Sequence, residues 1–430
     1  MKSAILGKIR QWLSKEWRKV SLSILISLFI LGFSYLLGNT SFPLPDEIGL
    51  FQKINGWNSF WGVQKGNVPD SLLFINVCYD KELADCEENG IPVGKYVITD
   101  REKLLRLLTQ AKAANNYRYI FLDVVFENEI KTPVDSALFQ TIASMDRIVI
   151  PVHDNLELAD TILYKKAANA DYTIAWEETN FARYQFLHQS GQAVPLKMYA
   201  DIKHLEGTGI QKHCGGLWYT DEGRLCHNGI TLLMRVRMTG RLMDTEGQVR
   251  ERNFIYLGAD LLDLDSIMPV KEQIEDKILV IGDFKNDVHD TYIGPQPGSA
   301  ICLNAYIALM NGDHLINWWC ALLLFCLYIA IGLFYLSGHS IMNHIKWKFL
   351  KIIMSFASLT IFFMVIAGIA YSFEVAFNIW VPTIAFSILD TAIQKYKDFN
   401  KKPNEKTVAT AESDTGNKPD ESRQLQSSIR

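Results

Sequence analysis

Strongly basic stretches and common catalytic motifs are absent from this chain of 430 residues. Lysine and arginine number 43 against 47 aspartates and glutamates, so the formal net charge is −4. No extended basic stripe lies outside the flanks of the apolar segments, which argues against a nucleic-acid partner. The Gly-x-Ser-x-Gly elbow, the His-Glu-x-x-His motif and the phosphate-binding loop are also missing. We therefore expect a binding protein rather than an enzyme, with no cofactor and no metal.

Charge is also missing, or nearly so, from long apolar stretches near both ends of the sequence. About 20 mostly apolar residues are needed for a helix to cross the hydrocarbon layer with its backbone polar groups satisfied internally. Four stretches meet this requirement, and the last of them contains Pro382 and Asp390. The predicted transmembrane helices are residues 20–38, 316–336, 352–371 and 375–393.

Basic residues flank these stretches on one side only. The leader, residues 1–19, carries six lysines and arginines against the single acid Glu16, whereas Asp46 and Glu47 follow the first stretch. Lysines also occupy the connection between the second and third stretches, and the beginning of residues 394–430. Both termini are therefore expected in the cytoplasm, and residues 39–315 in the periplasm or outside the cell. The predicted location is the inner (plasma) membrane, with an uncleaved anchor and a disordered cytoplasmic tail over residues 394–430.

The middle of the chain alternates short apolar runs with amphipathic helical segments, a pattern typical of parallel sheets. The predicted fold class is an α/β extracytoplasmic domain with a largely parallel sheet, plus four transmembrane helices. The stretch 179–229 is expected to be an elaborate loop region. The predicted strands are 71–77, 117–125, 147–152, 229–238, 253–258 and 277–282, and the predicted helices are 101–114, 135–144 and 299–310.

Five cysteines fall in the extracytoplasmic region, where disulfides can form; four of them lie in two close pairs, and Cys302 is left single. Cys78 with Cys86, and Cys214 with Cys226, are spaced to close short loops, although some could remain thiols. Zinc binding by His213, Cys214, Cys226 and His227 is a less favoured alternative, because adjacent residues usually point apart.

Polar side chains follow several predicted strands, and the carboxyl ends of parallel strands are where α/β sheets bind ligands. Such groups could bind a polar ligand, or could instead cap helices and fix loops. Arg101 begins a helix, where the dipole disfavours a cation, so it is expected to pair with a carboxylate. The ligand-binding candidates are Asp123, His153, Asp154, Asp283, Asp287, His289 and Asp290, with Arg101, Asn76 and Asp80 in support.

A block near the end of the extracytoplasmic region resembles a known family. The block comprises residues 281–284 (IGDF), 287–291 (DVHDT), Pro297-Gly298 and Asn304-Ala305, and residues 121–126 (FLDVVF) add to it. The arrangement is similar to that of the type-two CHASE domain family. The domains of this family are extracytoplasmic sensory modules of bacterial receptors. That resemblance implies one span, a sensor, three further spans and a cytoplasmic output domain. The tail here is too short for such an output domain, so a stand-alone form is expected.

We therefore expect a membrane-anchored sensor or scaffold that signals in trans to a cytoplasmic or membrane partner through its transmembrane bundle. Its partners would be the lipid bilayer and a separate signalling protein, and a homodimer remains open. Two alternatives stay open as well: a membrane-tethered extracytoplasmic hydrolase, and a structural subunit of an envelope complex.

Overall fold

The computed structural model describes residues 2–39, 71–88, 90–154, 156–171, 183–187, 191–204, 209–231, 254–291, 294–340, 348–372 and 378–414. The chain separates into two compact units. One is helical and contains residues 1–33, 319–367 and 378–430, and the other contains residues 34–318 and 368–377.

The larger unit is built on a parallel sheet of six strands, in the order β13-β1-β14-β4-β6-β7. Alternate side chains on each strand point to opposite faces, so that Leu279 and Ile281 of β14 join one core while Ile278 and Val280 face the other side. The strands are β1 (Leu72–Asn76), β4 (Tyr119–Leu122), β6 (Ile148–Val152), β7 (Ala167–Asn169), β13 (Phe254–Tyr256) and β14 (Ile278–Gly282). The predicted α/β class with a largely parallel sheet is confirmed.

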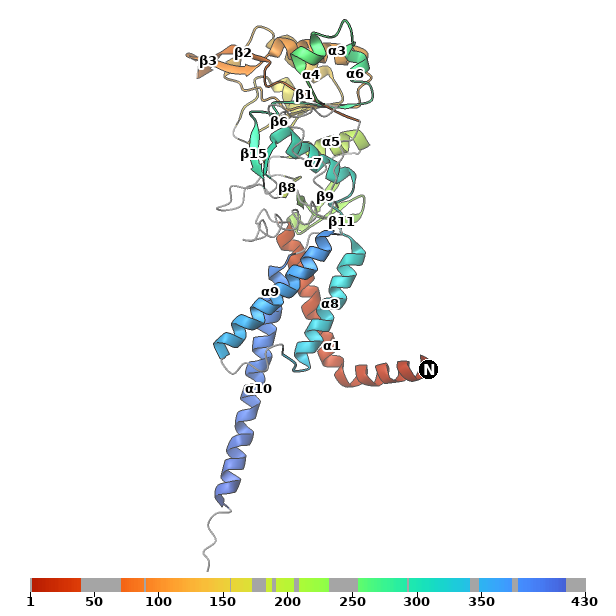
Figure 1. Ribbon diagram of the computed structural model, residues 1–430, viewed down its shortest axis with the longest axis vertical. Coiled ribbons are helices and arrows are strands. Elements are labelled where there is room, and N and C mark those ends of the chain that lie inside the picture. Colours follow the sequence, from red (N-terminus) through yellow and green to blue (C-terminus); the bar gives the residue numbers. More distant parts are fainter. Residues whose placement is uncertain are drawn as a thin grey trace, which may run out of the picture. The chain divides into compact units, whose positions relative to one another are not determined.

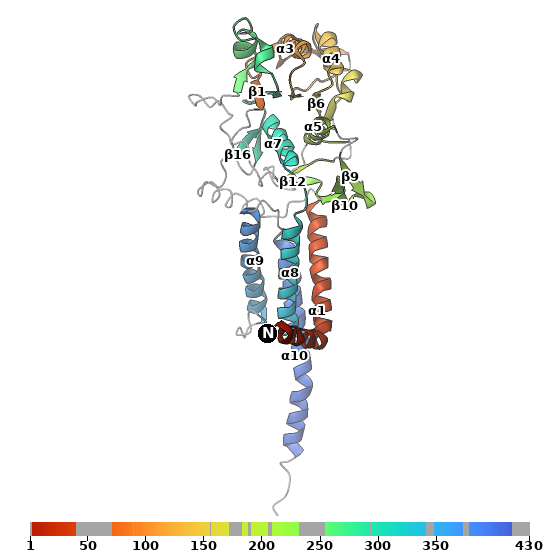
Figure 2. The ribbon, with the colours of Figure 1, turned by 90° about the vertical axis from the view of Figure 1, so that its right-hand side faces the viewer.

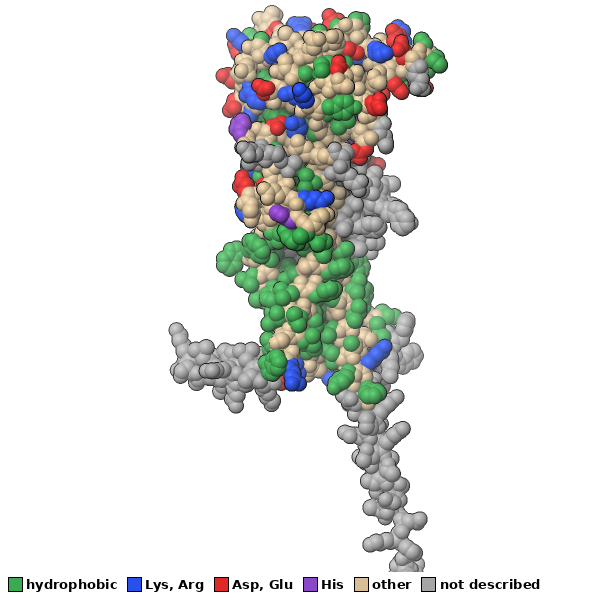
Figure 3. Space-filling view, turned by 180° about the vertical axis from the view of Figure 1, so that it is seen from behind, with side chains coloured by type: hydrophobic (Ala, Val, Ile, Leu, Met, Phe, Trp, Pro, Cys, Tyr) green, Lys and Arg blue, Asp and Glu red, His purple; other side chains and the backbone are tan. Residues whose placement is uncertain are grey.

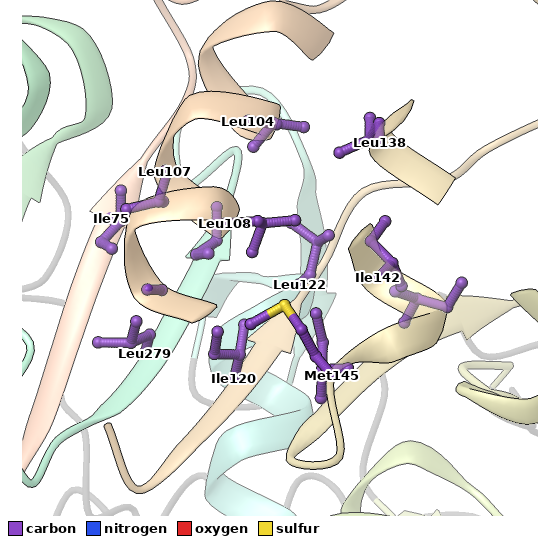
Figure 4. Close-up of a cluster of buried hydrophobic side chains, with 14 of the residues drawn as sticks. Ile75, Leu104, Leu107, Leu108, Ile120, Leu122, Leu138, Ile142, Met145 and Leu279 are labelled. Atoms are coloured by element: carbon purple, nitrogen blue, oxygen red, sulfur yellow. The ribbon is translucent and has the colours of Figure 1, made fainter. Parts of the chain in front are cut away.

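Helices cover both faces of this sheet (Figures 1 and 2). Leu104, Leu107 and Leu108 of α3 pack with Ile120, Leu122 and Ile142 in the core between the helices and the strands (Figure 4). Burial of each such side chain contributes about 1.5–3 kcal/mol. On one face lie α3 (Arg101–Ala114), α4 (Asp135–Ser144) and α6 (Val270–Gln273), and on the other α5 (Val194–Lys203) and α7 (Gly298–Met310).

Smaller sheets extend this unit. The antiparallel strands β2 and β3 fall in a segment where we predicted no strand, because their exposed residues lack a simple alternation of apolar and polar side chains. The region 179–229, expected to be a loop, holds α5 and several short strands in its described parts. Residues 232–238 of one predicted strand lie outside the described residues. The strands are β2 (Lys81–Glu88), β3 (Ile91–Thr99), β5 (Ile130–Lys131), β8 (Arg183–Gln185), β9 (Ile210–His213), β10 (Trp218–Asp221), β11 (Arg224–Cys226), β12 (Gly229–Thr231), β15 (Val288–Thr291) and β16 (Gly294–Pro297).

Three described helical segments are long and apolar enough to cross a membrane: Glu16–Gly38, Trp318–Leu336 and Ile352–Ile369. They belong to α1 (Lys2–Gly38), α8 (Trp318–Leu336) and α9 (Lys348–Ser372). Hydrophobic side chains cover much of the surface of the helical unit, as lipid contact requires (Figure 3).

The fourth predicted span corresponds to α10 (Trp380–Asp414), which is not among the three segments. Asp390, Gln394 and Lys395 interrupt its apolar stretch after only a few turns. The helix also continues through residues 394–414, which we expected to be disordered, while residues 415–430 lie outside the described residues.

Candidate functional site

The carboxyl ends of β1, β14 and β4 lie side by side at one edge of the sheet. Asn76 is in register with Gly282, and Ile281 with Leu122, so that Asp123 follows directly beside Gly282. The Asp123 backbone N–H donates to the Ile281 carbonyl at 2.7 Å. Residues distant in sequence therefore meet at this edge, which we call the rim.

Two predicted rim residues act as structural ties. The Asn76 side-chain oxygen accepts hydrogen bonds from the backbone N–H groups of Cys78 and Phe284. Asp80 accepts from the Lys103 ammonium at 2.6 Å and from the Gly258 N–H at 3.1 Å. Both side chains are buried, and their hydrogen bonds leave them little capacity to hold a ligand.

Asp283 is also a structural residue. Its carboxylate lies 2.7 Å from the Lys81 ammonium and accepts the backbone N–H groups of Lys285 and Asn286. Burial opposes ionisation of Asp283, but the hydrogen bonds from Lys81 and Asn286 outweigh it and hold the pKa of this carboxyl below its ordinary value. These hydrogen bonds tie Asp283 to the loop that follows β14.

Arg101 pairs with a carboxylate, as the sequence predicted. Its guanidinium lies 2.6 Å from the Asp135 carboxylate and donates to the Ile130 carbonyl at 3.2 Å. The rings of Phe126 and Phe139 flank it at 5.6 and 5.9 Å. Arg101 thus joins α3 to α4 and β5, and it is a packing residue rather than part of the rim.

His289 and Asp287 form a pair at the start of α7. The His289 Nε2 lies 3.0 Å from the Asp287 Oδ1, and this hydrogen bond raises the pKa of His289. A Cβ atom on Gly298 would lie 2.6 Å from the Asp287 Oδ2 and 3.2 Å from the His289 Nε2. The pair therefore lies directly against the first residue of the helix, and only glycine leaves room for it.

Asp123 is the most perturbed acid of the rim. Burial raises the pKa of its carboxyl to about 7, the nearby Asp287 adds to the effect, and His289 opposes it. Among the described residues its carboxyl accepts no hydrogen bond, so the alternative that Asp123 caps nearby backbone is not supported. Asp123 can thus exchange a proton near neutral pH, a property typical of functional carboxyls.

Ser299 belongs to the same place, and the sequence reasoning missed it. A Cβ atom on Gly282 would lie 3.2 Å from the Asp123 Cβ and 3.2 Å from the Ser299 Oγ, so both residues adjoin this glycine. The Ser299 residue is 1% exposed, and its hydroxyl makes no hydrogen bond in the described part of the chain. The Pro-Gly-Ser triplet at the helix start was the available signal.

His153 and Asp154 form a separate cluster beyond β6 and β7. The His153 Nδ1 lies 2.7 Å from the Asp171 carboxylate, and Asn169 donates to Asp154 at 2.7 Å. Tyr184 lies within electrostatic reach of both Asp123 and Asp171. Asp290 is exposed on β15.

The predicted disulfides are not formed, since all four cysteines are free thiols. Cys226 on β11 and Cys214 just after β9 are separated by β10, and two strand spacings of roughly 4.8 Å exceed the usual disulfide reach. Cys86 lies five residues into β2, so at roughly 3.3 Å per residue it is far from Cys78, which precedes that strand.

The zinc alternative is not supported either. His213 contacts Thr220 at 2.7 Å, and His227 packs on Tyr35 instead. The described residues contain no group of His, Cys, Asp and Glu side chains that could hold a metal ion.

The rim can bind a polar ligand by several complementary interactions. Asp123 offers an exchangeable proton, the Asp287–His289 pair offers charge, Ser299 offers a free hydroxyl, and the start of α7 offers the positive end of a helix dipole. Nucleophilic catalysis would need a base hydrogen-bonded to the Ser299 hydroxyl, and the described residues provide none. Comparison of the chain with protein-family models, with curated proteins and with solved structures finds no match.

Proposed function

We propose that this chain is a membrane-anchored extracytoplasmic sensor that binds a polar ligand at the rim and relays the event to a separate partner protein. The supporting observation is the course of α7. Its first residues, Gly298 and Ser299, adjoin the rim, and its last, Met310, precedes the start of α8 at Trp318 by only a short connection. A change at the rim would thus reach a candidate span through one helix.

The connection between α7 and α8 is fixed to a small sheet. His314 accepts a hydrogen bond from the His227 N–H through its backbone carbonyl at 2.9 Å, and the Ile316 N–H donates to Leu225 at 3.0 Å. The Tyr35 hydroxyl donates to the Cys226 carbonyl at 2.8 Å and accepts from the Tyr219 N–H. Movement of α7 would therefore displace the end of α1 as well as the start of α8.

The proposal also includes a membrane topology, which goes beyond the observation of three apolar helices. We take α10 as a fourth span, with both termini in the cytoplasm and the α/β unit outside it. Lysines at positions 346, 348 and 351 and beyond residue 394 favour this orientation. A reporter fused near residue 150 should be active only outside the cytoplasm. A reporter that is active in the cytoplasm would refute the proposal that the α/β unit is an extracytoplasmic sensor.

The relay itself can be tested by hydrogen exchange of the full chain in detergent. Asp123→Asn fixes a neutral group at the rim, and we expect it to change amide exchange across residues 311–317. The matched control is Asp290→Asn, which alters an exposed acid on the nearby β15. An effect confined to residues next to Asp123 would show that the rim and the spans are not coupled.

The partner in trans can be sought by crosslinking in native membranes followed by affinity purification. A sensor predicts that Asp123→Asn and His289→Gln change the amount of one crosslinked protein at a temperature and pH where thermal unfolding shows that both variants are folded. Unchanged crosslinking in both variants would favour the structural-subunit alternative.

A further inference from the structure

A buried aspartate lies inside the helical unit, far along the sequence from the rim. Asp390 on α10 is 2% exposed. Its carboxylate accepts hydrogen bonds from the Ser355 hydroxyl at 2.8 Å, the Ser340 hydroxyl at 3.4 Å and the Gln394 amide at 2.7 Å. Three parts of the chain, namely the segment after α8, α9 and α10, thus converge on one carboxyl group.

Oxygen atoms without hydrogen bonds lie around the same carboxylate. Tyr335 is 1% exposed, and its hydroxyl lies beside Ser355 and within electrostatic reach of Asp390. That hydroxyl makes no hydrogen bond of good geometry in the described part of the chain. The buried Ser387 hydroxyl, three residues before Asp390 on α10, also makes none. The hydroxyl oxygens of Tyr335 and Ser387 therefore have lone pairs that accept no hydrogen bond in the described part of the chain.

The charge of Asp390 is not balanced by any cationic side chain that the structure describes. Lys395 and Lys397 of α10 are exposed, and Lys397 donates to the Gly338 carbonyl. A carboxylate inside a membrane bundle is costly unless a charge of opposite sign neutralises it. One negative charge calls for one positive charge, because a divalent ion would leave an uncompensated charge in a medium of low dielectric constant.

We propose that Asp390, Ser355, Ser340 and Tyr335 bind a sodium ion inside the helical unit. The site offers oxygen ligands only, the type that hard cations prefer. Serine hydroxyls can rotate their protons away from Asp390 and present lone pairs, and the Gln394 amide can present its oxygen. Occupancy would draw α8, α9 and α10 together, and so set the state of the bundle that the proposed sensor uses.

This inference rests on the proposed placement of these helices in the bilayer, but its failure would be distinguishable from failure of the sensor. The test compares thermal unfolding of the full chain in detergent, in sodium chloride and in choline chloride at equal ionic strength. A ligand that binds only the folded state raises the unfolding midpoint. We expect a rise of several degrees in sodium, and equilibrium binding of radioactive sodium at a single ion per chain.

Asp390→Asn and Tyr335→Phe should both lose the sodium-dependent rise and the bound sodium. Tyr335→Phe keeps the carboxylate, so it serves where Asp390→Asn fails to fold. The matched control is Thr360→Val on α9, since the Thr360 hydroxyl bonds to its own helix at Phe356. This variant should respond to sodium as the unmodified chain does.

Equal midpoints in sodium and choline for the unmodified chain would overturn the proposal. So would a sodium response that persists in both site variants. A third outcome would also overturn the proposal: an unfolding midpoint that rises as the pH falls, does not respond to sodium, and loses its pH response in Asp390→Asn. The site would then bind a proton rather than a sodium ion. Topology reporters and exchange across residues 311–317 would remain valid in each of these outcomes.

Discussion

The guanidinium of Arg101 and the carboxylate of Asp135 form an ion pair at 2.6 Å, with Arg101 only 2% exposed. Removal of one partner from a buried pair leaves the other charge without compensation. Arg101→Met should therefore lower the free energy of unfolding by about 3 kcal/mol, as measured by chemical denaturation.

The matched control for that variant is Lys95→Met. Lys95 and Asp85 form an exposed pair at 3.5 Å, which water and salt screen. We expect a change of less than about 1 kcal/mol. Equal losses in the two variants would mean that Arg101 does not act through its buried pair.

Asp123 should make stability depend on pH near neutrality. Folding raises the pKa of this carboxyl from 3.8 to about 7, so the folded chain holds the proton more tightly than the unfolded chain. This contribution is complete below about pH 4 and is lost as the pH rises through about 7. Asp123→Asn keeps a neutral group at every pH, and should exceed the unmodified chain in stability at pH 8 by up to about 4 kcal/mol.

The same comparison at acid pH provides the check. The advantage of Asp123→Asn should shrink as the pH falls and be lost below the unfolded pKa of 3.8, where the unmodified Asp123 becomes protonated in both states. Thermal unfolding at several pH values measures it. An advantage independent of pH would mean that the substitution acts through packing rather than through ionisation.

His289 should add to this dependence with the same sign. The hydrogen bond to Asp287 raises the pKa of His289, so its stabilising contribution is present below the unfolded value of about 6.5 and is lost as the pH rises through the folded value. His289→Gln should destabilise the chain at pH 5.5 and have little effect at pH 8.5. A larger loss at pH 8.5 would contradict the Asp287–His289 pairing.

The thiols should differ widely in their reaction with alkylating reagents. Cys214 is exposed, whereas Cys226 is buried, and burial raises the pKa of the Cys226 thiol to about 12. Since the thiolate is the reactive form, Cys214 should be modified rapidly in the native state and Cys226 only after unfolding. Mass spectrometry of alkylated peptides measures both. A peptide that contains Cys214 joined to Cys226 would show that the disulfide forms after all.

Tyr35→Phe should weaken the tie between α1 and the small sheet. The Tyr35 hydroxyl donates to the Cys226 carbonyl and accepts from the Tyr219 N–H, so its loss leaves both backbone groups unpaired. We expect a loss of about 1–3 kcal/mol in the free energy of unfolding. Tyr96→Phe, at an exposed tyrosine on β3 in the same unit, is the control and should change little.

The sequence by itself determined the elements that depend on local pattern. Uninterrupted apolar length indicated the helices now seen as α1, α8 and α9, and the leucine spacing of 101–114 indicated α3, because both signals lie within one segment. The parallel sheet followed from the alternation of strands and helices. The β2–β3 hairpin escaped prediction since its stability comes from pairing rather than from an alternating pattern.

Only the tertiary structure decided which polar residues share a site. Asp123 and Asp283 look alike in sequence and are both half-buried. The Asp123 carboxyl accepts no hydrogen bond among the described residues, whereas the Asp283 carboxylate is held by Lys81 and loop amides. Ser299 joined Asp123 only through the register of β14 with β4, and Cys86 was separated from Cys78 by the direction of β2. Burial, pairing and distance are set by segments far apart along the chain, and no local pattern encodes them.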